Sequence, residues 1–292
     1  MLVNLYKLWF KITHPYKKWH HLDYLPEIKL VANNKQIEKI VFKNKVEIIP
    51  NKLESLLSYF NNERVFLVGS GPSIKEQNIQ LLTQEKTIFL NGAISLISSH
   101  NIYPSAFIVT DKRFIKNHKN LFFSLPPNIP CIFTLDIVRE ILNSDSNFFQ
   151  KHPLFLIKKA TRPYLENKIK IEELDATYFI KKNGTACSLD INHGFVEAGT
   201  VMYAAAQFIL SSEPREIVLV GFDLGNSNKP RFYENTNNQA KSKLQKALYK
   251  NIIPAFSLLT ELCYMKNIKI KNASAISKMP YDIIPYTNFL EF

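Results

Sequence analysis

A short loop with two glycines is the first candidate for binding chemistry. It follows an apolar run and precedes a helix-length segment, and it consists of Gly69, Ser70, Gly71, Pro72 and Ser73. Two glycines let a backbone approach a ligand closely. Ser73 can cap the next helix, whose first amide groups suit a phosphate or a ribose. The loop matches neither GxGxxG nor a P-loop, so a tight strand–helix turn is the alternative.

Polar side chains also end the next two apolar runs. Asn91 offers both a donor and an acceptor, as recognition of a base or a sugar requires. Asp111 is followed by Lys112 and Arg113. Because a carboxylate beside two cations at a strand end is unusual for packing alone, Asp111 is predicted to bind a hydroxyl or to act as a base. A structural ion pair with Arg113 is the alternative.

Two further loops place glycines where a ligand could approach. Gly199 and Thr200 open a helix rich in small residues, and Gly221 ends the last but one apolar run. Asp223 follows in the stretch GFDLG. These four residues are predicted to line the same ligand site as the first loop.

The segment at about 225–250 is predicted to be a small lid. Only six residues of the chain are arginine, and Arg231 stands two positions before Tyr233 in this segment. The pair could neutralise a departing phosphate, and a solvated lid is the alternative. His193 stands before the helix that Gly199 and Thr200 open and is predicted to be the only histidine near this group of loops, although a lone histidine is more often structural.

Motifs for other chemistries are missing. The chain contains no D-x-D tripeptide, which would clamp Mg²⁺ or Mn²⁺ on a sugar nucleotide, and no HExxH, CxxC or GxSxG. The three cysteines show neither metal-ligand spacing nor a disulfide framework, which favours a reducing cytoplasm. We therefore expect a site without a metal or other cofactor.

The elements that must position these residues alternate between short apolar runs and helix-length segments. The runs are continuously apolar and do not alternate with polar residues, as in strands buried on both faces. Strands that alternate with helices favour an α/β fold, a parallel Rossmann-like sheet with helices on both faces. Ligands of such sheets bind beyond the carboxyl ends of the strands. The predicted strands are 65–69, 87–91, 106–110, 131–135, 154–157, 216–221 and 268–272.

Composition narrows the class of protein further. A chain of 292 residues with 46% hydrophobic and 21% charged residues can build one large core, which excludes a disordered chain. The formal net charge is +12, but the lysines are dispersed and no nucleic-acid-binding module occurs. Nucleic acid is therefore not an expected partner. No apolar run approaches the ~20 residues that cross a bilayer.

Residues 1–22 are predicted to form a separate amphipathic, basic segment. Leu5, Trp9 and Ile12 share one face of a helix, and lysines follow at 17 and 18. Such a segment suits the surface of an anionic membrane. Packing on the protein's own core and an oligomer contact are alternatives. Residues 23–63 are predicted to be a connecting region, and 64–292 the Rossmann-like domain.

These motifs together resemble the bacterial sialyltransferases of glycosyltransferase family 42. The resemblance rests on VFLVGSGPSIKE (65–76), Asn91, GTVMYAAAQF (199–208) and EIVLVGFDL (216–224). It implies a GT-A-variant fold, a CMP-activated acid sugar as donor and no metal.

A closer resemblance, over roughly 64–286, is to the lipopolysaccharide-core proteins of the RfaZ/WaaZ type. It rests on LNGAISLISSHNIYPSAFIVTDKRF (90–114), GFDLGNSNKPRFYE (221–234) and YDIIPY (281–286). It implies transfer of 3-deoxy-D-manno-octulosonic acid (Kdo) from CMP-Kdo to a lipid A–core acceptor, at the inner face of the cytoplasmic membrane of a Gram-negative bacterium. A CMP-sialic acid-dependent sialyltransferase and a non-enzymatic, membrane-docked module are the alternatives.

The resemblance also suggests roles for residues. It assigns the nucleotide to the loop 69–73 and Asn91, and it makes Ser274 a nucleotide contact. The lid histidine of the sialyltransferases has no counterpart, since 235–251 contains no histidine. Asp111, His193 and Glu234 are therefore unranked candidates for the general base.

Overall fold

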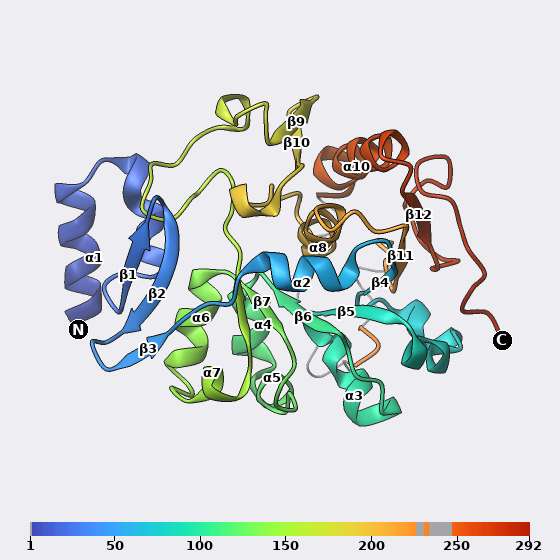
Figure 1. The fold of residues 1–292 in the computed structure, drawn as a ribbon, viewed down its shortest axis with the longest axis horizontal. Helices are drawn as coiled ribbons and strands as arrows, with labels where there is room; N and C mark the ends of the chain where they lie inside the picture. Colours follow the sequence, from blue (N-terminus) through green and yellow to red (C-terminus); the bar gives the residue numbers. More distant parts are fainter. Residues whose placement is uncertain (1, 226–230, 234–246) are drawn as a thin grey trace.

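The centre of the protein is a seven-stranded parallel sheet (Figure 1). It is seen in a computed structural model that describes residues 2–225, 231–233 and 247–292. The strand order is β12-β11-β4-β5-β6-β7-β8. Each predicted apolar run is confirmed as a strand of this sheet. The strands are β4 (Arg64–Val68), β5 (Lys86–Leu90), β6 (Ala106–Val109), β7 (Cys131–Phe133), β8 (Leu154–Leu156), β11 (Glu216–Val220) and β12 (Lys269–Asn272).

Alternate side chains of the sheet enter two separate hydrophobic cores. Val65 and Leu67 of β4 join the core on one face, whereas Phe66 and Val68 join the core on the other. The same alternation holds for β5, β6 and β11. Both sets are fully buried, which explains why the strands are continuous apolar runs in the sequence.

Helices cover both faces of the sheet. The first core contains side chains of α2 (Leu53–Phe60), α8 (Val201–Leu210) and α10 (Ile253–Met265). The second contains those of α3 (Ser95–His100), α4 (Lys112–Asn117), α5 (Lys119–Phe123), α6 (Leu135–Leu142) and α7 (Phe148–Lys151). The prediction of an α/β fold with a parallel sheet covered on both faces is therefore confirmed.

Short elements connect these layers. A hairpin is formed by β9 (Phe179–Lys182) and β10 (Thr185–Ser188). The 3-10 helices are η1 (Tyr16–Asp23), η2 (Pro72–Glu76), η3 (Ile79–Gln84), η4 (Asn91–Ile94), η5 (Ile171–Glu173) and η6 (Ile191–His193), and η7 (Leu248–Ile252) is a π-helix.

The region predicted as a connector is a further folded layer. Its strands β1 (Ile28–Asn33), β2 (Gln36–Phe42) and β3 (Val46–Ile48) form an antiparallel sheet. Ile28 and Ile40 are fully buried and belong to the second core. The connecting region thus packs on the main domain and then leads into α2.

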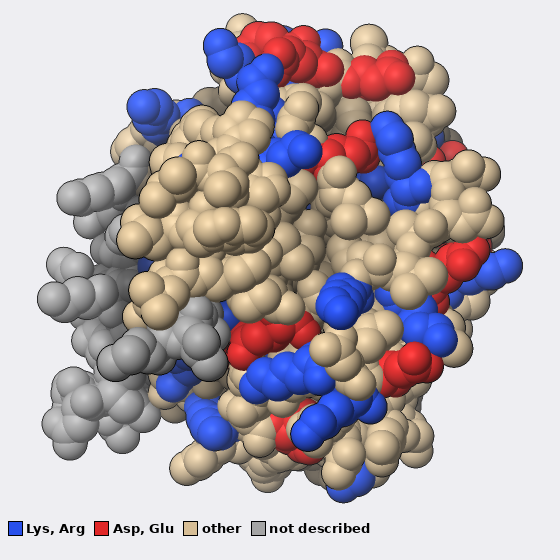
Figure 2. Space-filling model, turned by 90° about the vertical axis from the view of Figure 1, so that its left-hand side faces the viewer, with Lys and Arg blue, Asp and Glu red and all other residues tan. Residues whose placement is uncertain are grey.

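Helix α1 (Leu2–Thr13) leaves much of its apolar face exposed. Phe10 is buried, whereas Leu5 and Leu8 are each 59% exposed, Trp9 is 53% exposed and Ile12 is 76% exposed. Figure 2 views this side, where a broad uncharged surface is bordered by Lys and Arg as well as Asp and Glu side chains. None of the described helices is both long enough and apolar enough to cross a bilayer.

Hydrogen bonds attach the segment after α1 to the main domain. His20 Nε2 lies 2.9 Å from the carbonyl oxygen of Pro163, and His21 Nε2 lies 2.9 Å from that of Glu166. Residues 2–22 therefore combine a helix with an exposed apolar face and a 3-10 helix that is hydrogen-bonded to the domain.

Candidate functional site

The carboxyl ends of β4 and β11 form a topological switch point. The chain after β4 turns to the second core, and the chain after β11 returns to the first core through α10. Gly69 N donates to Val220 O at 2.8 Å, and Gly71 N donates to Gly221 O at 3.0 Å. Such a switch point is the usual ligand site of an open α/β sheet. The predicted glycine loop lies there and is joined to the end of the neighbouring strand.

A buried carboxylate holds this loop in place. Asp223 accepts hydrogen bonds from Ser73 N at 2.9 Å, from Ser73 Oγ at 2.5 Å and from Ser274 Oγ at 2.5 Å. These three predicted ligand-binding residues are thus brought together, but their polar atoms bind one another. The geometry favours a role for these side chains in positioning the glycine loop. Pro72 of this loop is the first residue of η2.

Helix α8 begins beside the same loop. Thr200 Oγ1 accepts from Met202 N at 3.2 Å and so caps the helix. Met202 Cε lies 3.1 Å from where a Cβ on Gly69 would stand. Gly199 has a φ of 84°, and an added Cβ there would lie 2.9 Å from Ala247 Cβ. The small residues at this position therefore serve close packing of the helix start against the loop.

Asn91 and Tyr233 meet at the end of β5. Asn91 has a φ of 49°, and its Oδ1 is buried without a hydrogen-bond partner among the described residues. Gly92 makes room for Tyr233, because an added Cβ would lie 1.8 Å from Tyr233 Cε1. Arg231 Nη1 donates to the Tyr233 hydroxyl at 3.3 Å. The predicted base-recognition and phosphate residues are thus neighbours in space.

Only part of the predicted lid lies within the described residues. Residues 226–230 and 234–246, with the candidate base Glu234, lie outside the described residues. The described part returns to the glycine loop, since Phe232 N donates to Ser70 O at 3.4 Å.

Asp111 is engaged in a structural pair. It caps α4 by accepting from Arg113 N at 3.0 Å, and it also accepts from the Arg113 guanidinium. Burial acts to raise the pKa of Asp111, but the side-chain and backbone hydrogen bonds of Arg113 outweigh this and hold the pKa below its ordinary value. A carboxylate with a lowered pKa is a poor base near neutral pH. The alternative considered from the sequence, the Asp–Arg pair, is what the structure contains.

The histidines are arranged differently from the prediction. His193 stacks on Tyr178 with ring centroids 3.4 Å apart, and its Nε2 lies 3.7 Å from Asp190 Oδ2. His118 instead packs edge-on against Tyr233, with ring centroids 5.3 Å apart. The prediction that His193 is the only histidine near these motifs is therefore wrong. His118 was missed because it lies outside every motif, although it follows Asp111 by only one short helix.

Metal ligands do not gather in the part of the chain that the structure describes. No three His, Cys, Asp or Glu side chains there are close enough to hold an ion together. The three cysteines, at positions 131, 187 and 263, are free and buried.

Several solved structures are similar to this chain. A Maf glycosyltransferase from Magnetospirillum magneticum has a TM-score of 0.45 and 16% identity, over 75% of this chain and 33% of that one. The sialyltransferase CstII from Campylobacter jejuni, solved with cytidine-5'-monophosphate, has a TM-score of 0.42 and 14% identity, over 79% of this chain and 89% of that one.

Sequence relatives extend over most of the chain. A probable 3-deoxy-manno-octulosonic acid transferase of Salmonella typhimurium is 27% identical over 230 residues, or 74% of this chain and 84% of the relative. One from Escherichia coli is 26% identical over 256 residues, or 84% and 89%. The family model described as 3-deoxy-D-manno-octulosonic acid transferase WaaZ matches residues 48–290. With a match that includes the whole parallel sheet and its strand-end loops, the chain belongs to the WaaZ family of Kdo transferases.

Proposed function

We propose that this Kdo transferase uses CMP-Kdo as donor and the inner core of lipopolysaccharide as acceptor. The observation that carries the donor assignment is that Gly92, which follows Asn91 at the end of β5, lies against Tyr233, whose hydroxyl accepts from Arg231. A buried amide oxygen without a described partner suits a base or sugar, and a guanidinium suits a phosphate. A GT-A-variant arrangement with a small lid over about 225–250 is part of the proposal.

The chemistry follows from the anionic leaving group. The acceptor hydroxyl attacks the anomeric carbon of Kdo and loses its proton, while the bond from that carbon to the CMP oxygen breaks. Negative charge grows on the phosphate as this bond breaks, and Arg231 with Tyr233 would stabilise it there. No step needs a metal ion, because the arginine supplies the positive charge.

His118 is our candidate for the general base. It contacts Tyr233 through its ring, whereas the Asp111 carboxylate is occupied by Arg113. An imidazole can also accept a proton from a hydroxyl and pass it on, as a general base must.

The exposed face of α1 supports a peripheral location at the inner face of the cytoplasmic membrane, where a lipid A–core acceptor would be found. Leu8 and Ile12 point their side chains to solvent, and Lys11 lies on the same helix. Apolar contact and attraction to anionic lipids would add together.

The decisive experiment offers CMP-Kdo and CMP-sialic acid separately, each with a lipid A–core acceptor, in EDTA and in Mg²⁺. We expect transfer of Kdo from CMP-Kdo but no transfer from CMP-sialic acid, and equal rates in EDTA and in Mg²⁺. Transfer from CMP-sialic acid alone would support the sialyltransferase alternative. An absolute requirement for a divalent ion would contradict the metal-free reaction.

A further inference from the structure

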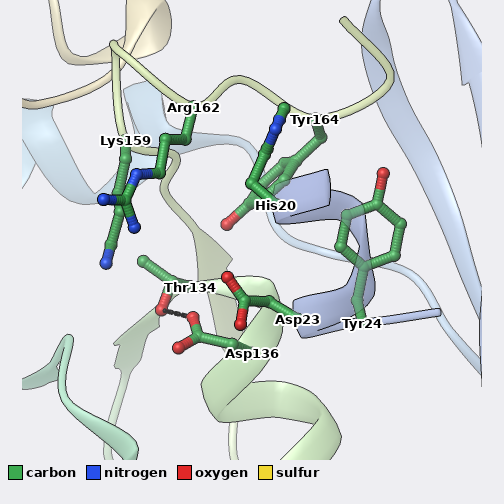
Figure 3. A pocket seen from close by; sticks show the side chains of 8 residues that line it. All are labelled: His20, Asp23, Tyr24, Thr134, Asp136, Lys159, Arg162 and Tyr164. Carbon is green, nitrogen blue, oxygen red and sulfur yellow. Dashed lines mark hydrogen bonds between the residues drawn. The ribbon is translucent and has the colours of Figure 1, made fainter. Parts of the chain in front are cut away.

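A polar cavity lies where the N-terminal segment meets the carboxyl ends of β7 and β8 (Figure 3). Thr134 and Asp136 follow β7, and Thr134 Oγ1 donates to Asp136 Oδ1 at 2.6 Å. Lys159 and Arg162 follow β8, and Asp23 comes from η1. In Figure 3 the two cationic groups lie together on one side, and the two carboxylates lie on the other.

The two cations of this cavity are not equivalent. Lys159 Nζ lies 2.7 Å from Glu197 Oε1, so its charge is already compensated. The exposed Arg162 side chain makes no hydrogen bond or ion pair with any described residue. A guanidinium without a carboxylate partner is suited to a carboxylate or phosphate oxygen of a ligand.

The remaining polar groups suit hydroxyls. Asp136 and Asp23 can accept hydrogen bonds from sugar hydroxyl groups. His20 Nε2 is engaged with Pro163 O, and its Nδ1 is buried without a hydrogen-bond partner among the described residues. The enclosed space is about 20 Å³, which admits one or two water-sized groups, so the ring of a sugar would lie in the open mouth.

The cavity continues the edge that carries the donor site. Strands β6, β7 and β8 are neighbours, so Asp111, Thr134 and Lys159 lie at or just beyond the ends of adjacent strands. Lys112 Nζ lies 3.4 Å from Asp23 Oδ1 and links the β6 loop to the cavity wall. A molecule held on Arg162 could therefore extend along the sheet edge toward the donor.

We propose that this cavity is the acceptor subsite, and that it binds the anionic group of a hydroxyl-rich acceptor sugar through Arg162. The proposal rests on the proposed function, because a glycosyltransferase must bind its acceptor next to its donor. The anionic group is a carboxylate of an acidic sugar or a phosphate on a sugar. Because η1 lines the cavity and α1 precedes it directly, an acceptor embedded in a membrane under α1 would be presented at this wall.

The test compares Arg162→Ala with Arg215→Ala. Both arginines are exposed, but Arg215 precedes β11, the strand next to the opposite edge of the sheet. Binding of two deacylated core oligosaccharides is measured without donor, one with a carboxylate-bearing sugar and no phosphate, the other with phosphate and no acidic sugar. We expect Arg162→Ala to weaken binding of at least one of them roughly tenfold or more, with Arg162→Lys in between. CMP binding should change less than about twofold, and Arg215→Ala should match the wild type.

The pattern of loss identifies the anionic group. Loss confined to the carboxylate-bearing oligosaccharide assigns a carboxylate, and loss confined to the phosphorylated one assigns a phosphate. Unchanged binding of both in Arg162→Ala, or an equal loss in Arg215→Ala, would overturn the subsite. These measurements need no turnover, so a failure to use CMP-Kdo would reject the proposed function and leave the subsite to be decided by binding.

Discussion

At the scale of single residues, close backbone packing shapes the candidate donor site. Gly71 leaves space that the carboxylate of Asp223 fills, and that carboxylate in turn holds Ser73 and Ser274. The amide oxygen of Asn91, which follows β5, is unengaged among the described residues. The carboxyl-end edge of the sheet therefore carries two kinds of residues. Some hold the glycine loop in place, and others can bind a ligand.

We predict that Gly71→Ala lowers stability and abolishes CMP binding. The new Cβ would stand 2.4 Å from Asp223 Oδ2 and 2.6 Å from Gly221 O, and such overpacking costs ~1–3 kcal/mol. Gly184→Ala is the control, because its Cβ would meet nothing within 4 Å and only its φ of 74° opposes the change, by ~1 kcal/mol. Urea unfolding and CMP titration measure both effects. Wild-type CMP affinity in Gly71→Ala would separate the loop from nucleotide binding.

We predict that His118→Gln lowers kcat for transfer about 10²- to 10⁴-fold, as expected for loss of a general base. A base acts only when deprotonated, so the fall of kcat on the acid side of the pH profile should also disappear. His193→Gln should stay close to the wild type, because the described contacts of His193 are with Tyr178 and Asp190. The pH dependence of kcat for both variants is the measurement. A His118→Gln profile identical to that of the wild type would remove this histidine from the reaction.

At the scale of elements, ion pairing attaches the N-terminal layer to α6. Glu27 accepts a hydrogen bond from Arg139 Nε, and from Asn143 Nδ2 at 3.3 Å. Arg139 Nη1 also donates to the carbonyl oxygen of Asp23 at 3.3 Å. Since Asp23 lines the proposed acceptor cavity, this contact fixes one wall of the cavity relative to the sheet.

We predict that Glu27→Gln lowers the free energy of unfolding by ~1–3 kcal/mol at pH 7. Burial acts to raise the pKa of Glu27, but the hydrogen bond and charge of Arg139 outweigh it and hold the pKa below its ordinary value. The stabilisation is therefore complete above the unfolded pKa of ~4.3 and is lost as pH falls through the lower folded pKa. Urea unfolding at pH 7 and pH 3 should show a smaller effect of the variant at pH 3. An equal effect at both would assign it to packing.

At the scale of the whole molecule, the exposed helix α1 is followed directly by η1, which lies against the carboxyl ends of β7 and β8. Helix α1 lies at one end of the protein and α10 at the other (Figure 1). Between α1 and the main sheet stand η1 and the antiparallel sheet, and η1 carries His20 and Asp23 of the acceptor cavity (Figure 1). Membrane contact and acceptor binding would therefore take place on the same side of the protein.

We predict that the double variant Leu8→Ser and Ile12→Ser weakens binding to anionic vesicles roughly tenfold or more. Its melting temperature should stay near that of the wild type, because the two side chains are 59% and 76% exposed. Tyr264→Ser with Met265→Ser, at the end of α10, is the matched control, since these side chains are 86% and 69% exposed. Vesicle co-sedimentation measures the difference. Raised salt should weaken wild-type binding only in part, because apolar contact is not screened.

Two results would contradict the membrane assignment. Equal vesicle binding by the α1 variant and the wild type would show that the face contacts something else. A large fall in melting temperature would show that the helix face contributes to packing.

The sequence by itself determined the sheet and the edge that carries the site. Six continuous apolar runs became parallel strands with buried side chains on both faces, because such a strand needs apolar side chains at nearly every position. The seventh strand, β12, lies at the edge of the sheet, where Ile270 is buried and Lys269 is exposed. Glycines at 69, 71, 92 and 221 marked the strand ends, because only a residue without a Cβ lets backbone and neighbouring groups come this close. Such features depend on which residue types follow one another over a few positions of the sequence.

Only the tertiary structure decided which polar atoms are already engaged. Asp223 and Ser274 are 51 positions apart and bind each other, Asp111 is occupied by Arg113, and His118 reaches Tyr233 from an unrelated loop. The acceptor cavity likewise combines η1 with the ends of β7 and β8. A hydrogen-bonding group serves a ligand or the fold according to its neighbours in space, and those neighbours come from distant parts of the chain.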